Sequence, residues 1–170
     1  MLIYLAARLL RFHPLLNACF GDDAILLYEP VNIGLAFDVE ADSTVAVPVL
    51  READTKTLAE IAREAAALAE HAASHHLDLA ELADATFTIA DQSGLEIDHF
   101  VPILNERQSA ILALSSPRPR AVPRDQRLIA APVAELAVAF DHRVLNATAA
   151  ARFLHAVREA IEHFAAPTAL

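Results

Sequence analysis

Helical and β-rich segments alternate along almost the whole chain. The segment 56–74 is rich in Ala, Glu and Leu, and its apolar residues recur at helical spacing, at Leu58, Ile61, Ala65, Leu68 and Ala72. We expect helices at 2–13, 56–74 and 147–164, a helical turn at 79–82, and strands at 24–28, 31–39, 45–51, 86–90, 109–115 and 133–140. Asp54 or Thr55 is the expected cap of the second helix. This alternation predicts a two-layer α/β domain.

The composition favours an oligomer. A chain of 170 residues is long enough for one domain with a sizeable core. Apolar residues make up 55% of the chain and charged residues only 21%. We therefore expect other subunits to cover part of its apolar surface.

The charge distribution argues against a nucleic-acid partner. The formal net charge is −10, whereas phosphate binding requires a concentrated positive patch. The densest basic run contains four arginines interspersed with prolines: Arg118, Arg120, Arg124 and Arg127 with Pro117, Pro119 and Pro123. We interpret this run as an extended, solvated loop; the alternative is an anion site. The chain has three glycines, at positions 21, 34 and 94, and no glycine-rich phosphate loop.

Cysteine usage and the N-terminal segment predict a cytoplasmic protein without a membrane partner. Cys19 is the single cysteine, so one chain cannot form an internal disulfide, which fits a reducing compartment. The apolar start of the chain is interrupted by Arg8 and Arg11 and is too short to span a bilayer.

His142 is the main candidate for chemistry. It follows the apolar strand expected at 133–140, and Asn146 comes four residues later, before the last helix. An imidazole titrates near neutral pH and suits general base catalysis. The competing interpretation is a buried histidine that caps the following helix.

A second histidine group lies at the end of the helix expected at 56–74. His71 and His75 have the i, i+4 spacing that can place two ligands on one metal, and His76 is adjacent. No third ligand of defined geometry accompanies them. We interpret these residues as surface histidines and expect no metal site.

Seven segments together resemble the catalytic domain of the dihydrolipoyl acyltransferases, the core subunits of 2-oxoacid dehydrogenase complexes. Residues 140–147 resemble a motif that ends in D-H-R-x-x-D-G. Six further segments resemble family motifs in the same order: 13–18 (H-P-x-L-N-A), 31–34 (V-N-I-G), 47–51 (V-P-V-I-R), 87–90 (F-T-I-S), 100–105 (F-T-P-I-I-N) and 108–112 (Q-x-A-I-L). The resemblance implies a chloramphenicol-acetyltransferase-like two-layer sandwich, with a mixed sheet and helices on one face.

The resemblance also implies a domain organisation. Residues 1–170 form a single acyltransferase-like domain that lacks the family's usual N-terminal segment, with no lipoyl or subunit-binding domain. Lys56, the only lysine, is faintly like a lipoylation site, but its place at a helix start favours an ordinary surface lysine.

The resemblance further implies a reaction and its partners. The family transfers acyl groups between dihydrolipoamide and coenzyme A, so coenzyme A is the expected substrate and no covalent cofactor is expected. His142 is the implied general base and Asn146 the implied brace of its loop. The implied assembly is a homotrimer or a higher multiple of three, joined by other subunits of a 2-oxoacid dehydrogenase complex.

Several residues depart from the family pattern. Ala90 stands where the family carries a Ser or Thr that donates a hydrogen bond to the oxyanion, and Ser93 is the nearest possible substitute. Asp91 places a negative charge beside that position. Ala113 and the Glu106-Arg107 pair replace Gly and Pro-Pro.

Three functions therefore stand as hypotheses. The first is an acyltransferase with weakened or lost activity. The second is a non-catalytic assembly subunit, and the third is an acyltransferase acting on another acceptor.

Overall fold

The chain folds around a mixed central sheet. The computed structural model describes residues 1–39, 44–74 and 76–165. The sheet comprises β3 (Ile33–Val39), β4 (Thr44–Ala46), β5 (Val49–Leu50), β6 (Phe87–Asp91), β7 (Ala110–Leu114) and β10 (Leu136–Phe140). Their order is β10-β7-β6-β3-β4, with β5 also paired to β3. Strands β3, β6 and β7 are parallel, and the other three are antiparallel to their neighbours.

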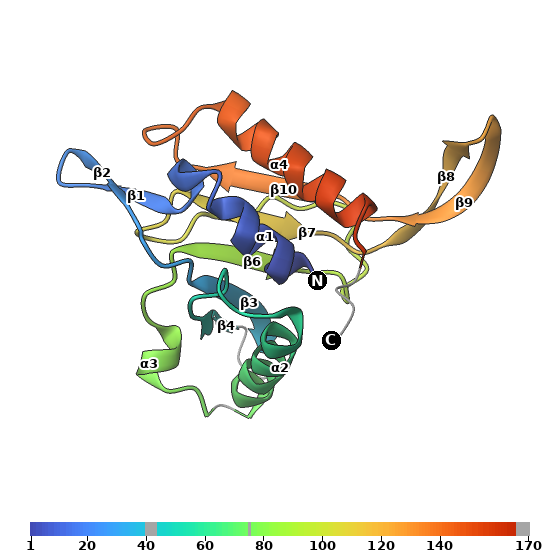
Figure 1. The fold of residues 1–170 in the computed structure, drawn as a ribbon. Helices are drawn as coiled ribbons and strands as arrows, with labels where there is room; N and C mark the ends of the chain where they lie inside the picture. Colours follow the sequence, from blue (N-terminus) through green and yellow to red (C-terminus); the bar gives the residue numbers. More distant parts are fainter. Residues whose placement is uncertain (40–43, 75, 166–170) are drawn as a thin grey trace.

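Helices cover one face of this sheet (Figure 1): α1 (Leu2–Leu10), α2 (Leu58–Ala73) and α4 (Ala147–Glu162). Helix α1 lies between the other two and contacts both. Between the layers, Phe87 of β6 packs edge-to-face on Phe153 of α4, with ring centroids 5.8 Å apart. The expected two-layer sandwich with helices on one face is confirmed.

The opposite face of the central strands is covered by the chain that connects β6 to β7. Asn105 of this connection donates a hydrogen bond of 2.9 Å to the hydroxyl of Thr88 in β6. Residues 87–90 are consequently buried on both faces, and the one polar side chain among them, Thr88, is hydrogen-bonded.

Two hairpins project from this framework. The first joins β1 (Ala18–Gly21) to β2 (Ala24–Leu27), and the second joins β8 (Arg118–Arg124) to β9 (Arg127–Val133). The β8–β9 hairpin extends away from the body of the molecule (Figure 1). Both turns consist of two residues with positive φ, for example 49° and 60° at Asp125 and Gln126. Such turns match the twist of paired strands.

The β8–β9 hairpin corrects two expectations. The arginine- and proline-rich run is not an extended loop but a β-ladder in which Pro119 faces Pro132. The prolines concealed this ladder because a strand rarely tolerates residues without a backbone donor. The single strand expected at 133–140 is also divided, since β9 ends at Val133 and β10 begins at Leu136.

Other element boundaries shift for local reasons. The strand expected at 45–51 is divided into β4 and β5 around Pro48. Helix α2 begins at Leu58 because Thr57, rather than Asp54 or Thr55, forms a capping box with Glu60. Asp54 instead accepts a hydrogen bond of 2.7 Å from Arg11. The helical turn α3 (Leu79–Leu82) and the 3₁₀ turn η1 (Pro14–Leu16) complete the fold.

Candidate functional site

His142 lies in the tight turn between β10 and α4. The turn is closed by the amide of Val144, which donates to the carbonyl oxygen of Asp141 at 2.9 Å. The imidazole is exposed, and its ring centroid lies 5.1 Å from that of Phe140. The alternative of a buried, helix-capping histidine is therefore wrong, because the ring faces solvent and another residue caps α4.

That capping residue is Asn146. Its side-chain oxygen accepts a hydrogen bond of 3.0 Å from the amide of Ala149. This bond satisfies one of the free amide groups in the first turn of the helix. Asn146 thus ties the end of the His142 turn to the start of α4.

The two neighbours of His142 in the sequence form an ion pair. Arg143 contacts the Asp141 carboxylate with both Nε and Nη2, at 2.6 to 3.1 Å. Hydrogen bonding to Arg143 lowers the pKa of the Asp141 carboxyl below its usual value. The guanidinium of Arg143 also lies 4.7 Å from the centre of the Phe20 ring in β1. These contacts brace the turn between two elements.

Ala90 is the last residue but one of β6 and is almost completely buried, at 6% exposure. Its register partners are Ala36 in β3 and Ala113 in β7, and Ala113 in turn faces Ala137 in β10. Four alanines therefore form a row across the sheet. None of these side chains has a hydrogen-bond donor.

After Ala90, the polar residues Asp91 and Ser93 contact each other. The Asp91 carboxylate accepts a hydrogen bond of 2.8 Å from the backbone amide of Ser93. Asp91 is exposed and Ser93 is partly buried. The Asp91 carboxylate thus stabilises the local turn, and Asp91 directly follows Ala90 in the chain.

Most motif asparagines and threonines have structural hydrogen-bond partners, and several of them, together with Gln108, also line a cavity: Asn32, Thr86 and Asn105. Thr86 donates to the side-chain oxygen of Asn17 at 2.6 Å and accepts from the amide of Asn32 at 3.0 Å. A second group joins Thr88, Asn105 and Gln108, with bonds of 2.8 and 2.9 Å. The sequence alone did not predict a role for Thr86 or Thr88. The feature that could have indicated a buried hydrogen-bond network is a pair of hydroxyl side chains at alternate positions, 86 and 88, of an otherwise apolar segment.

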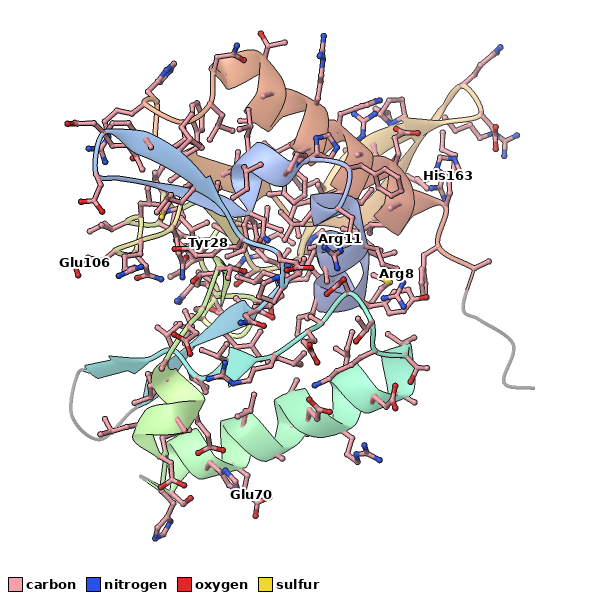
Figure 2. All side chains as sticks on the ribbon, turned by 60° about the vertical axis from the view of Figure 1, so that its left-hand side comes forward. Arg8, Arg11, Tyr28, Glu70, Glu106 and His163 are labelled. Carbon is pink, nitrogen blue, oxygen red and sulfur yellow. The ribbon has the colours of Figure 1, made fainter. Side chains whose placement is uncertain are left out.

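Two cavities lie on either side of the turn 105–108. One, of about 440 Å³, is lined by residues that include Phe20, Arg107, Asp141 and Arg143. The other, of about 540 Å³, includes Tyr28 and Glu106, which Figure 2 shows on the same side of the molecule. The hydroxyl of Tyr28 donates to the carbonyl oxygen of Arg107 at 2.8 Å, and burial raises the pKa of this phenol.

Neither of these two cavities is lined by both His142 and Ala90. Asp141 and Arg143, which flank His142, line the smaller cavity, whereas His142 itself does not. Within the described part of one chain, the two sequence-predicted site residues are thus not brought into a shared cavity.

Three cationic residues in or next to α1 and α2 have structural partners: Arg8, Arg11 and Lys56. Arg8 and Arg11 project from α1 and its end (Figure 2); Arg8 donates to the carbonyl oxygen of Lys56, and Arg11 to that of Glu29. The amine of Lys56 pairs with the carboxylate of Glu64.

Within residues 1–39, 44–74 and 76–165, no group of three His, Cys, Asp or Glu side chains is arranged to hold a metal ion. His71 pairs with Glu81 at 2.9 Å, while His75 lies outside the described residues.

In the part of the chain that the structure describes, no helix has the length and apolar composition needed to cross a membrane.

Comparisons of the sequence define the family. The profile of the 2-oxoacid dehydrogenases acyltransferase catalytic domain matches residues 1–169. The acetyltransferase component of the acetoin cleaving system of Bacillus subtilis is 30% identical over 95% of this chain and 40% of its own length. The succinyltransferase component of the 2-oxoglutarate dehydrogenase complex of Cupriavidus necator is 32% identical, over 92% of this chain and 37% of its own length. The chain thus spans about two fifths of these relatives.

Solved structures agree with this assignment. A probable dihydrolipoamide acetyltransferase from Listeria monocytogenes superposes with a TM-score of 0.91 at 30% identity, over 99% of this chain and 71% of that one. The dihydrolipoamide acetyltransferase of Azotobacter vinelandii gives 0.89 at 32% identity, over 95% and 67%. Chloramphenicol acetyltransferase shares the fold alone, with a TM-score of 0.53 at 16% identity over 93% and 75%.

The protein is thus a two-layer α/β domain of the acyltransferase class. It belongs to the family of 2-oxoacid dehydrogenase acyltransferase catalytic domains.

Proposed function

We propose that this chain transfers acyl groups between dihydrolipoamide and coenzyme A, with His142 as the general base and with a turnover reduced by Ala90. The observation that carries the proposal is the placement of His142: it is exposed, fixed in a braced turn, and followed at the fourth position by the Asn146 cap.

The Azotobacter enzyme supports this assignment. Its catalytic mechanism was investigated through a serine, a histidine and an asparagine, with the histidine 52 residues after the serine and four before the asparagine. In this chain, His142 likewise follows Ala90 by 52 residues and precedes Asn146 by four. The equal spacing supports the proposal that Ala90 stands at the serine position.

The proposed chemistry follows from thiol acidity. A free thiol has a pKa of roughly 8.5 and is mostly protonated at neutral pH. The His142 imidazole would remove this proton as the sulfur attacks the thioester carbonyl, which forms a tetrahedral oxyanion. Collapse of that intermediate breaks the other C–S bond and expels a thiolate, to which the imidazolium returns the proton. Asn146 would hold the turn that positions the imidazole.

Ala90 would limit this reaction, because a methyl group cannot donate a hydrogen bond to the oxyanion. Loss of one oxyanion donor lowers turnover on the order of a hundredfold to a thousandfold. Asp91 adds an unfavourable negative charge near the same position. We therefore propose a slow acyltransferase.

The proposed assembly is a homotrimer, or a higher multiple of three, within a cytoplasmic complex of the 2-oxoacid dehydrogenase type. Large apolar side chains are exposed on one chain, including Phe12 at 80%, Val101 at 69% and Ile103 at 89%. The cubic core of a pyruvate dehydrogenase multienzyme complex superposes with a TM-score of 0.88. A site between two subunits would also explain why His142 and Ala90 share neither of the two cavities at the turn 105–108 in one chain. The lipoyl group would arrive on another domain or protein.

An acyl-transfer assay tests the proposed reaction. Acetyl-coenzyme A and dihydrolipoamide would be incubated with the wild type, His142→Ala and Ala90→Ser, and thioester exchange followed by mass spectrometry. We expect a slow wild-type rate, loss of that rate in His142→Ala, and a gain on the order of a hundredfold in Ala90→Ser. Equal rates in the wild type and His142→Ala would exclude the general base role.

The row of alanines favours a second candidate, a non-catalytic assembly subunit that retains the fold to bind other acyltransferase chains. Native mass spectrometry and co-purification with dehydrogenase subunits would test it. Mixed complexes, together with an Ala90→Ser variant that remains inactive, would favour this function. A strictly monomeric chain of 18.4 kDa without partners would contradict both candidates.

A further inference from the structure

The loop 91–98 begins at Asp91, the last residue of β6 and the neighbour of Ala90, and it has little apolar packing of its own. None of its residues is buried, and Leu95 is 51% exposed. A Cβ added at Gly94 would meet no heavy atom within 4 Å. Such a segment is expected to open easily unless polar contacts hold it.

Ser116, just after β7, supplies the first set of these contacts. Its amide donates to the carbonyl oxygen of Ile97 at 2.8 Å, and its hydroxyl accepts from the amide of Ile97 at 3.0 Å. The same hydroxyl donates to the carbonyl oxygen of Gln92 at 3.0 Å. Ser116 itself is 4% exposed, and the bonds of its hydroxyl are partly buried.

Arg118, the first residue of β8, supplies the second set. Its Nε donates to the Asp98 carboxylate at 3.1 Å, and its Nη2 donates to the carbonyl oxygen of Glu96. Glu96 has a φ of 58°, a left-handed conformation that is unfavourable for a residue with a Cβ. The guanidinium of Arg118, at the base of the β8–β9 hairpin, therefore stabilises the strained backbone conformation at Glu96.

We propose that Arg118 is a positioning residue: it fixes the conformation of the loop 91–98 beside Ala90 and thereby couples the β8–β9 hairpin to the acyl-transfer site. This role rests on the proposed function. Arg118 acts through the loop backbone and does not touch a reacting atom. Because its side chain is 38% exposed, its substitution leaves the core intact.

Hydrogen exchange measured by mass spectrometry tests the structural half of the proposal without any substrate. Arg118→Gln is compared with the wild type and with Arg124→Gln, a charge-matched control at the hairpin tip. We expect faster exchange of peptides covering 91–98 in Arg118→Gln, unchanged exchange in the core strands, and no change in the control. Unchanged exchange of the loop in Arg118→Gln would overturn the proposal.

Kinetics in the Ala90→Ser background test the functional half. We expect Arg118→Gln to lower kcat about tenfold or more with a smaller effect on KM, because a displaced site mainly loses transition-state alignment. Arg118→Lys should restore part of the loss, since it keeps a charge near Asp98. A mobile loop with unchanged kcat would overturn the positioning role. If Ala90→Ser has no turnover at all, the proposed function fails, whereas the exchange result still decides whether Arg118 fixes the loop.

Discussion

Asp141 and Arg143 show how two charges that flank His142 determine the geometry of one turn. The pair is held by short contacts, of which the closest is 2.6 Å, and the Asp141 side chain is only 12% exposed. An exposed ion pair contributes little to stability, but this one is bidentate and anchored on Phe20. Its main effect is to orient the turn that carries His142.

Acid stability should depend on this pair. The folded-state pKa of Asp141 is lowered by Arg143, whereas an aspartate in an unfolded chain titrates at about 3.9. The unfolded state therefore binds the proton first, so the stabilisation is present above about pH 4 and is lost as the pH falls through the folded-state pKa. Arg143→Gln should move acid unfolding, measured by circular dichroism, to higher pH. Arg152→Gln is the control, and coincident acid transitions for both variants would refute the dependence.

Asn146 carries a measurable part of the stability of α4. Asn146→Ala leaves the amide of Ala149 without its 3.0 Å partner and should lower the free energy of unfolding by about 1 kcal/mol in urea denaturation. Asn146→Ser retains a capping oxygen and should remain close to the wild type. Equal losses in the two variants would show that capping is not the cause.

The packing at the centre of the sheet leaves little room for a side chain at Gly34 in β3. A Cβ at this position would lie 2.9 Å from both the Thr88 hydroxyl and a Val47 methyl group. Gly34→Ala should therefore destabilise the protein by about 1–3 kcal/mol through overpacking. Gly94→Ala, in open space, should change stability by less than about 0.5 kcal/mol. Thermal unfolding of both variants makes the comparison, and similar melting temperatures would contradict it.

For the molecule as a whole, Thr86 links three segments that are distant in sequence. Thr86→Val preserves shape but leaves the Asn17 side-chain oxygen and the Asn32 amide without a buried partner. We expect a loss of about 1–3 kcal/mol. Thr55→Val removes an exposed hydrogen bond to Glu52 and should cost much less. Urea denaturation distinguishes the two, and equal effects would disprove a special role for the buried network.

Local patterns were sufficient for much of the architecture. The helical spacing of 56–74 predicted α2, and the apolar runs at 86–90 and 109–115 predicted β6 and β7, because burial on one or both faces leaves a direct periodicity in the sequence. The same signal failed at β8, because prolines interrupt the run. It also failed at the start of α2, where the side-chain geometry makes Thr57 the cap rather than Asp54 or Thr55.

The sequence by itself determined the family, the layer order and the identity of the residues around His142 and Ala90, since each is encoded in short segments. Only the tertiary structure decided what those residues meet. The register of four strands aligned Ala36, Ala90, Ala113 and Ala137, and long-range packing brought Arg118 onto the loop 91–98. Strand register and loop contacts depend on the packing of distant segments, which no local pattern specifies.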